Sequence, residues 1–215
     1  MTARVVRDGA VGRAQAVEIL RGGGVVALPT DTVYGIAVSL ATPGGVERLF
    51  HVKRRPPDKG VMLLLEDAAQ AADAGLITPA AAALMAACWP GGLTVIVPQR
   101  PDVRWPAALT GGSPTIGLRV PDHDAPRALA RGVGPLPTTS ANVSGAPEAR
   151  DAAGVVDQLG DAIDLVLDGG PARGGPASTI VDCTGERPTI LRAGAVPLET
   201  VAAVLAAAGI ELSGN

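Results

Sequence analysis

Residues 21–39 read RGGGVVALPTDTVYGIAVS and contain a change from helix to sheet. The three glycines predict the end of an amphipathic helix over 13–21, because glycine is common just beyond a helix C-terminus. The run Val25–Leu28 predicts a strand directly after them, and Gly35–Ser39 predicts a second extended segment. These glycines precede a strand, whereas those of a dinucleotide-binding fingerprint follow one. We therefore interpret them as a helix cap.

Strand and helix signals alternate along the rest of the chain. Val46–Lys53 has the pattern of a short helix, Thr78 and Pro79 are typical of a helix start, and 198–208 predicts a closing helix. This alternation predicts an α/β fold, a twisted mixed sheet with flanking helices. Because we find no repeat and no long linker, we expect residues 1–215 to form a single domain. Further strands are predicted at Val61–Leu65, Leu93–Val97, Thr115–Val120, Leu136–Ser140, Leu165–Leu167, Thr179–Cys183 and Thr189–Arg192.

The composition excludes several classes of protein. Hydrophobic residues make up 47% and charged residues 18% of the 215 residues, which is typical of a globular chain. The longest apolar runs are about half of the roughly 20 residues that a membrane-spanning helix needs, so no membrane association is expected. The N-terminus has no secretion signal, which predicts a cytoplasmic protein. The two histidines and two cysteines have no zinc-site spacing, so we expect no protein-built metal site.

The segment Lys53-Arg54-Arg55-Pro56-Pro57-Asp58-Lys59 concentrates positive charge. Its four cations and one anion give +3 in a chain whose net charge is -3, and crowded like charges favour a visiting anion. A triphosphate would suit them, because arginine binds phosphate oxygens in a bidentate manner and lysine adds a point charge. The alternative is a solvated surface loop after a helix C-terminus.

Short polar side chains recur at every second residue from the end of the strand predicted at Leu136. In an extended chain Thr138, Ser140 and Asn142 would project to one face and suit a ligand with several polar atoms. The alternative is an Asx or Ser turn that leads into the next helix.

The predicted strand Thr115–Val120 carries an arginine. Thr115 and Arg119 share a face with Gly117 between them, so another group can approach the backbone beside the arginine. This pattern suits a carboxylate or a phosphate, and the alternative is a structural ion pair with a neighbouring acid. Weaker single cues of the same kind are Thr30, Thr32, Ser178, Thr179 and Arg192.

Together, seven motifs in this order and spacing resemble the YrdC-like family, the L-threonylcarbamoyladenylate synthases, in the short form with a single domain. The resemblance covers about residues 10–205. The motifs are Pro29-Thr30-Asp31-Thr32-Val33-Tyr34-Gly35, Lys53-x-Arg55-Pro56-x-x-Lys59, Trp89-Pro90-Gly91-Gly92-Leu93-Thr94, Thr115-x-Gly117-x-Arg119-x-Pro121, Ser140-Ala141-Asn142-x-Ser144-Gly145, Ser178-Thr179-Ile180-Val181-Asp182 and Leu191-Arg192-x-Gly194.

The resemblance implies a twisted sheet with a concave, positively charged cavity. It also implies a nucleotidyltransferase that condenses L-threonine, bicarbonate and ATP into L-threonylcarbamoyladenylate and pyrophosphate, the first step of tRNA threonylcarbamoyladenosine modification. Mg²⁺ would accompany ATP, and a separate tRNA threonylcarbamoyl transferase would receive the product. Weak binding of tRNA or other RNA is a further expectation.

Residue roles follow from the same resemblance, position by position. The catalytic residues would be Lys53, Arg55, Ser140 and Asn142. The residues that bind ATP would be Arg55, Lys59, Thr115, Ser140 and Arg192. The residues that hold threonine would be Thr32, Arg119, Thr138 and Ser178, with Arg119 on the carboxylate.

Two positions depart from the family pattern. Leu64 stands where many relatives have a histidine, and Glu148 stands where they have a small hydroxyl residue. Two other functions stay open at this point. One is an RNA-binding paralogue without synthase activity, which the net charge of -3 and the nearly complete set of polar motif residues disfavour. The other is a relative that forms a carbamoyl-adenylate.

Overall fold

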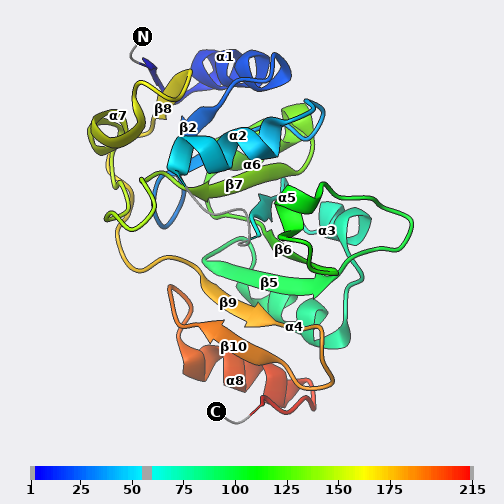
Figure 1. The fold of residues 1–215 in the computed structure, drawn as a ribbon. Helices are drawn as coiled ribbons and strands as arrows, with labels where there is room; N and C mark the ends of the chain where they lie inside the picture. The colour runs from blue at the N-terminus through cyan, green and yellow to red at the C-terminus, as the bar shows by residue number, and fades with distance from the viewer. Residues whose placement is uncertain (1–2, 55–59, 214–215) are drawn as a thin grey trace.

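The protein, seen in a computed structural model that describes residues 3–54 and 60–213, is built on a ten-stranded mixed sheet (Figure 1). The strands are β1 (Arg4–Arg7), β2 (Val26–Leu28), β3 (Gly35–Ala37), β4 (Met62–Leu64), β5 (Leu93–Pro98), β6 (Thr115–Arg119), β7 (Leu136–Ser140), β8 (Leu165–Asp168), β9 (Thr179–Asp182) and β10 (Thr189–Arg192). The helices are α1 (Ala10–Arg21), α2 (Gly45–Lys53), α3 (Ala69–Ala74), α4 (Pro79–Cys88), α5 (Ala107–Thr110), α6 (Asp124–Val133), α7 (Ala152–Leu159) and α8 (Leu198–Ala207). The strand order is β1-β8-β2-β3-β7-β4-β6-β5-β9-β10.

The predicted α/β class and mixed sheet are confirmed, and every predicted strand is present within two residues of its expected ends. Gly22 caps α1, and Thr78 caps α4 by accepting a hydrogen bond from the Ala81 amide, as the sequence predicts. Strand β1 was not predicted. Its two valines lie between arginines and it is an exposed edge strand, so it has little local signal and depends on parallel pairing with β8. Helices α3, α5, α6 and α7 were not located individually from the sequence.

The two faces of the sheet are covered unequally. Successive residues of a strand point to opposite faces, so the buried side chains of β2, for example, divide between two hydrophobic clusters. The larger cluster contains residues of α2, α3, α4, α5, α7 and α8, and the smaller one contains residues of α1 and α6. Because the smaller cluster ends at β4, the same face of β6, β5 and β9 is left without a helix. That uncovered face forms the floor of a cavity.

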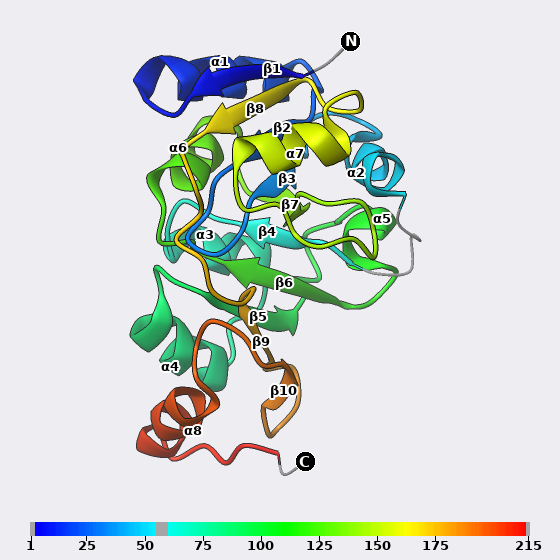
Figure 2. The same cartoon turned by 90° about the vertical axis from the view of Figure 1, so that its left-hand side faces the viewer.

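A long crossover joins the two halves of the sheet. Residues 169–178 leave β8 near one end of the sheet and run to β9 near the other, past the strands between them (Figures 1 and 2). The Tyr34 hydroxyl donates to the Gly170 carbonyl at 2.7 Å and accepts from the Gly169 amide at 3.1 Å. The crossover is thereby attached to the start of β3, and it delivers Ser178 to the cavity.

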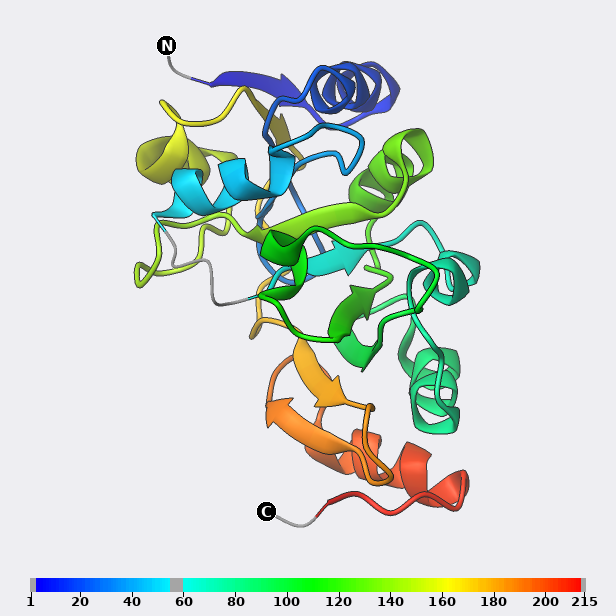
Figure 3. The same ribbon diagram turned by 45° about the vertical axis from the view of Figure 1, so that its right-hand side comes forward.

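Strand β1 and helix α8 lie at opposite ends of the sheet, which twists between them (Figure 3). Helix α8 packs on α4 beside the β9–β10 hairpin. None of the helices in the described ranges is long and apolar enough to cross a membrane.

Candidate active site

A cavity of about 360 Å³ lies over the uncovered face of the sheet, within the range of small-molecule sites. It collects seven of the predicted site residues, which come from loops and strands far apart in the sequence. They are Thr32, Thr115, Arg119, Thr138, Ser140, Ser178 and Arg192. Of the other predicted residues, Lys53 and Asn142 form hydrogen bonds with the lining residue Ser140. Arg55 and Lys59 lie outside the described residues.

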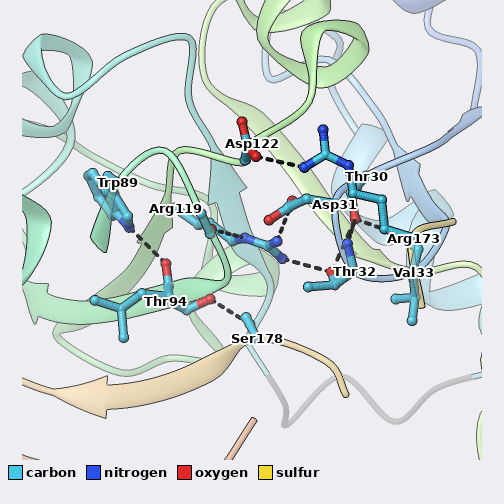
Figure 4. A network of polar contacts seen from close by, with 12 residues as sticks. Thr30, Asp31, Thr32, Val33, Trp89, Thr94, Arg119, Asp122, Arg173 and Ser178 are labelled. Atoms are coloured by element: carbon cyan, nitrogen blue, oxygen red, sulfur yellow. Dashed lines mark hydrogen bonds and ion pairs between the residues drawn. The ribbon is translucent and has the colours of Figure 1, made fainter. Parts of the chain in front are cut away.

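Arg119 is the most buried cation of the cavity wall, with 3% of its surface exposed. Its Nη2 donates to Asp31 Oδ1 at 2.6 Å, its Nη1 to Thr32 Oγ1 at 3.2 Å and its Nε to the Gly91 carbonyl at 3.0 Å (Figure 4). Burial lowers the pKa of Arg119, while the Asp31 carboxylate acts to raise it. The structure therefore realises the ion pair that the sequence left as an alternative. Arg119 nevertheless lines the cavity beside Gly117, as that pattern predicted.

The loop between β2 and β3 is held by its own threonines. Thr30 Oγ1 donates to the Val33 carbonyl at 2.7 Å and accepts from the Thr32 amide at 3.1 Å. Because the single Thr30 hydroxyl proton is used in this way, the 3.1 Å contact between the two hydroxyls requires Thr32 to be its donor. Thr32 then accepts from Arg119, and its orientation in the cavity is fixed.

A second polar cluster lies in the cavity wall, where β5, β9 and β10 meet. Ser178 Oγ lies 2.8 Å from Thr94 Oγ1, and Arg192 Nη2 donates to the same Ser178 oxygen at 3.1 Å. Arg192 also donates from Nε and Nη2 to the Ser178 carbonyl, at 3.0 and 2.8 Å. The serine is thus held between a threonine and an arginine. The charge of Arg192 is one of the causes that lower the pKa of Arg119, so the two cations face the same region.

Lys53 organises the turn at the end of β7. Its Nζ donates to the Ser140 carbonyl at 2.5 Å, to Ser140 Oγ at 3.1 Å and to Asn142 Oδ1 at 2.9 Å. The Asn142 amide donates to the carbonyls of Val143 and Ala146, at 3.0 and 2.8 Å. Asn142 therefore follows the strand and faces Lys53, and it does not extend the row of Thr138 and Ser140 into the cavity. Its contact with the cavity wall runs through Lys53 and Ser140.

The rest of the lining divides into polar and apolar parts. The Thr138 hydroxyl donates to the Leu136 carbonyl at 2.8 Å, and Thr115 Oγ1 contacts Ser113 Oγ at 2.8 Å. The apolar part of the wall would suit a planar base or a methyl group. The residues that contribute to it include Val61, Met62, Leu64, Ile96, Leu109 and Ile180.

Both departures from the family pattern lie in the cavity wall. Leu64 is buried at the border of the α1–α6 cluster, next to Arg119 in the β4–β6 register. Glu148 is half-buried, and no hydrogen bond or ion pair links it to the residues that the structure describes. The described charged lining therefore consists of Arg119, Arg192 and Glu148.

Sequence reasoning assigned no role to Asp31, Thr94 or the Gly91 carbonyl, although all three hold residues of the cavity wall. Thr94 had a usable signal, because it is a polar residue in an otherwise apolar strand. Asp31 had no such signal, because its partner lies 88 residues away. The described residues include no group of three or more His, Cys, Asp or Glu that could hold a metal ion.

The chain matches known proteins along most of its length. The chain is 38% identical over 194 residues to the threonylcarbamoyl-AMP synthase of Bacillus subtilis, covering 89% of this chain and 56% of that protein. It is 40% identical over 195 residues to a putative threonylcarbamoyl-AMP synthase of Mycobacterium leprae, covering 90% of this chain and 88% of that protein. The chain thus spans just over half the length of the first relative and most of the second.

Solved structures also match this chain over most of its length. Pyrococcus abyssi Sua5 complexed with L-threonine superposes with a TM-score of 0.88 at 31% identity, covering 99% of this chain and 62% of that one. Escherichia coli YciO superposes with a TM-score of 0.80 at 27% identity, covering 92% and 97%. A family model described as "Telomere recombination" (Sua5_yciO_yrdC) matches residues 18–194. The chain belongs to the Sua5/YciO/YrdC family.

Proposed function

We propose that this protein is an L-threonylcarbamoyladenylate synthase, which condenses L-threonine, bicarbonate and ATP and releases pyrophosphate. The observation that carries the proposal is the cavity itself. The buried Arg119 lines the cavity, and so does Ser140, whose turn is held by hydrogen bonds from Lys53. The threonylcarbamoyl-AMP synthase names of relatives at 38–40% identity support this assignment, as does the L-threonine complex of P. abyssi Sua5.

The reaction needs no covalent enzyme intermediate. Bicarbonate loses hydroxide to give CO₂, and the neutral amine of threonine adds to its carbon and loses a proton to form a carbamate. The proton and the hydroxide combine as water. A carbamate oxygen then attacks the α-phosphate, and the bond to pyrophosphate breaks. The thiols are unsuited to act as nucleophiles, because burial raises the pKa of Cys88 and raises that of Cys183 to about 12. Catalysis would therefore come from positioning and charge stabilisation.

We assign this work to two regions of the cavity. In the amino-acid corner, Arg119 would bind the threonine carboxylate, with Thr32, Thr138 and Ser178 around the rest of the molecule. On the nucleotide side, Ser140, Thr115 and Arg192 would contact ATP. Lys53, held by Asn142, would place its positive charge next to the Ser140 turn. Arg55 and Lys59 are proposed as triphosphate ligands on the basis of the sequence motif.

Mg²⁺ is proposed to arrive with ATP as part of the substrate. Among the described lining residues Glu148 offers a carboxylate, and Asp31 is already paired with Arg119, so the chain supplies few ligands of its own. The ion would shield the phosphate charges, as it does in other phosphoryl-transfer sites. The residues present are compatible with that use of the ion.

The product is a mixed anhydride of a carbamate and a phosphate, which water attacks readily. It therefore requires an acceptor enzyme, and we propose a tRNA threonylcarbamoyl transferase in the cytoplasm. Weak contact with tRNA would assist such a transfer.

The test is pyrophosphate release by the purified protein with ATP, Mg²⁺ and bicarbonate, with and without L-threonine. We expect release that depends on both threonine and bicarbonate, together with a mass-spectrometric signal for the adenylate. If the folded protein gives no turnover with any combination, the synthase assignment is wrong. Salt-dependent RNA binding without turnover would then favour the RNA-binding alternative.

A further inference from the structure

The amino-acid corner has an unusual balance of charge. The cavity lining contains two guanidinium groups, those of Arg119 and Arg192, and the Asp31 carboxylate is bonded directly to Arg119. The ion pair is almost completely buried, with side-chain exposures of 4% for Arg119 and 8% for Asp31. The charges of Arg119 and Asp31 therefore cancel within the amino-acid corner, and Arg192, assigned above to the nucleotide, adds one positive charge to the cavity.

The Asp31–Arg119 contact leaves the arginine able to bind a second carboxylate. Only Oδ1 of Asp31 takes part, at 2.6 Å, and Oδ2 accepts no hydrogen bond from the described parts of the chain. Arg119 donates through three of its five N–H groups, to Asp31, Thr32 and Gly91, so two make no hydrogen bond to the described residues. Asp31 belongs to a loop, whereas the strand β6 and the Gly91 carbonyl hold the guanidinium itself.

We propose that Asp31 is a resident counter-ion that sets how strongly Arg119 holds the carboxylate of the amino-acid substrate. Without a ligand, Asp31 neutralises the charge of Arg119. Burying that charge without a partner would cost free energy. When the substrate binds, its carboxylate meets a guanidinium that is already neutralised, so it binds more weakly than to an unpaired arginine. The proposal rests on the proposed function, because it takes the competing carboxylate to be that of L-threonine.

Such a counter-ion has a use in the reaction. The product keeps the carboxylate of threonine, so every favourable contact that Arg119 makes with the substrate is also made with the product. A weaker hold at this point accelerates release of an unstable product to its acceptor. Asp31 is thus a positioning and affinity-setting residue, and it does not touch the reacting atoms.

The experiment compares the wild-type protein with Asp31→Asn, which retains the shape and one acceptor oxygen but removes the charge. Calorimetric titration without ATP measures the affinity for L-threonine and for L-threoninol, which lacks the carboxylate. We expect the Kd for L-threonine to fall about tenfold in Asp31→Asn, because one compensating charge close to the guanidinium is lost. The affinity for L-threoninol, a cation without a carboxylate, should not increase. The melting temperature without ligand should fall, and L-threonine should raise it more than in the wild-type protein.

Asp8→Asn is the matched control, because Asp8 forms an equally short 2.6 Å ion pair with Arg13 outside the cavity. It should leave the affinity for L-threonine unchanged. An unchanged or higher Kd for L-threonine in Asp31→Asn would overturn the counter-ion proposal alone if the wild-type protein still releases pyrophosphate. Absence of threonine binding by both proteins would overturn the proposed function as well.

If Asp31→Asn does not fold, the double variant Asp31→Asn/Arg119→Gln decides the matter. It removes the buried cation together with its counter-ion, so we expect it to fold and to melt above the single variant. A double variant that is as unstable as the single one would show that Asp31 does not act through Arg119, and would overturn the proposal.

Discussion

Ser178 and Thr32 illustrate how the polar residues of the cavity are held in place by the protein itself. Each is almost fully buried and hydrogen-bonded to an arginine and to a threonine. Side chains fixed in this way lose little freedom when a ligand binds, which favours precise positioning. The same contacts leave fewer hydrogen-bonding groups on these side chains for a ligand. Among these residues we expect Arg119 to have the most specific effect on substrate binding when it is replaced. Two of its N–H groups make no hydrogen bond to the described residues.

Arg119→Gln should raise the KM for L-threonine by about 10- to 100-fold, the range expected from losing charge-assisted hydrogen bonds to a carboxylate. The KM for ATP should change far less, because the contacts proposed for the nucleotide belong to other residues. Steady-state kinetics with each substrate varied in turn measure both values. Arg173→Gln is the control, because it breaks an exposed ion pair with Asp122 near the same corner. Equal effects of Arg119→Gln on both substrates would show that the arginine is misassigned.

At the scale of the element, β6 shows how one strand serves the core and the site together. Its residues Ile116 and Leu118 belong to the large hydrophobic cluster, while Thr115, Gly117 and Arg119 alternate with them and face the cavity. Gly117 lines this floor without a side chain. A Cβ atom built there would lie 3.6 Å from Met62 Cβ and 3.7 Å from Thr94 Cγ2, which are ordinary contacts.

Gly117→Ala should therefore fold and bind almost as the wild-type protein does. Gly117→Leu should also fold, because its side chain extends into open space, but it should raise the KM of both substrates by about tenfold or more by filling the cavity. Thermal melting and steady-state kinetics on the two variants separate stability from binding. Full activity of Gly117→Leu would mean that the substrates bind away from this floor.

At the scale of the whole molecule, the crossover over residues 169–178 connects the halves of a ten-stranded sheet. Tyr34 attaches it by two hydrogen bonds, and its side chain is fully buried. Burial raises the pKa of Tyr34 to about 12. The folded protein therefore keeps the phenol protonated at pH values where an unfolded chain, with a tyrosine pKa of about 10, has lost that proton.

Folding stability due to Tyr34 should be complete below about pH 10 and should decrease as the pH rises towards 12, because the unfolded state then releases the proton first. Tyr34→Phe should lower the free energy of unfolding at neutral pH by about 1–3 kcal/mol through the lost hydrogen bonds. It should also lose less stability than the wild-type protein above pH 10. Tyr34 is the sole tyrosine, so tyrosinate absorbance reports its titration directly. A midpoint near pH 10 in the folded protein would contradict this account.

The sequence by itself determined the order of the elements and the chemistry available to them. Apolar periodicity, glycine stops and the Thr78-Pro79 start are local signals, so helices such as α2 and strands such as β7 were predictable within a few residues. The edge strand β1 was not, because its existence depends on a partner from the other end of the chain. The motifs also supplied most of the cavity residues, although Asp31 received no role.

Only the tertiary structure decided which of these residues meet. Lys53 reaches Ser140 across 87 residues, Asp31 reaches Arg119 across 88, and Thr94 reaches Ser178 across 84. These pairings follow from the strand order and from the one sheet face that α1 and α6 leave uncovered. Local sequence patterns reveal neither the strand order nor the uncovered face, because strand order is the outcome of packing the entire chain. The counter-ion beside Arg119 is a property of the fold for the same reason.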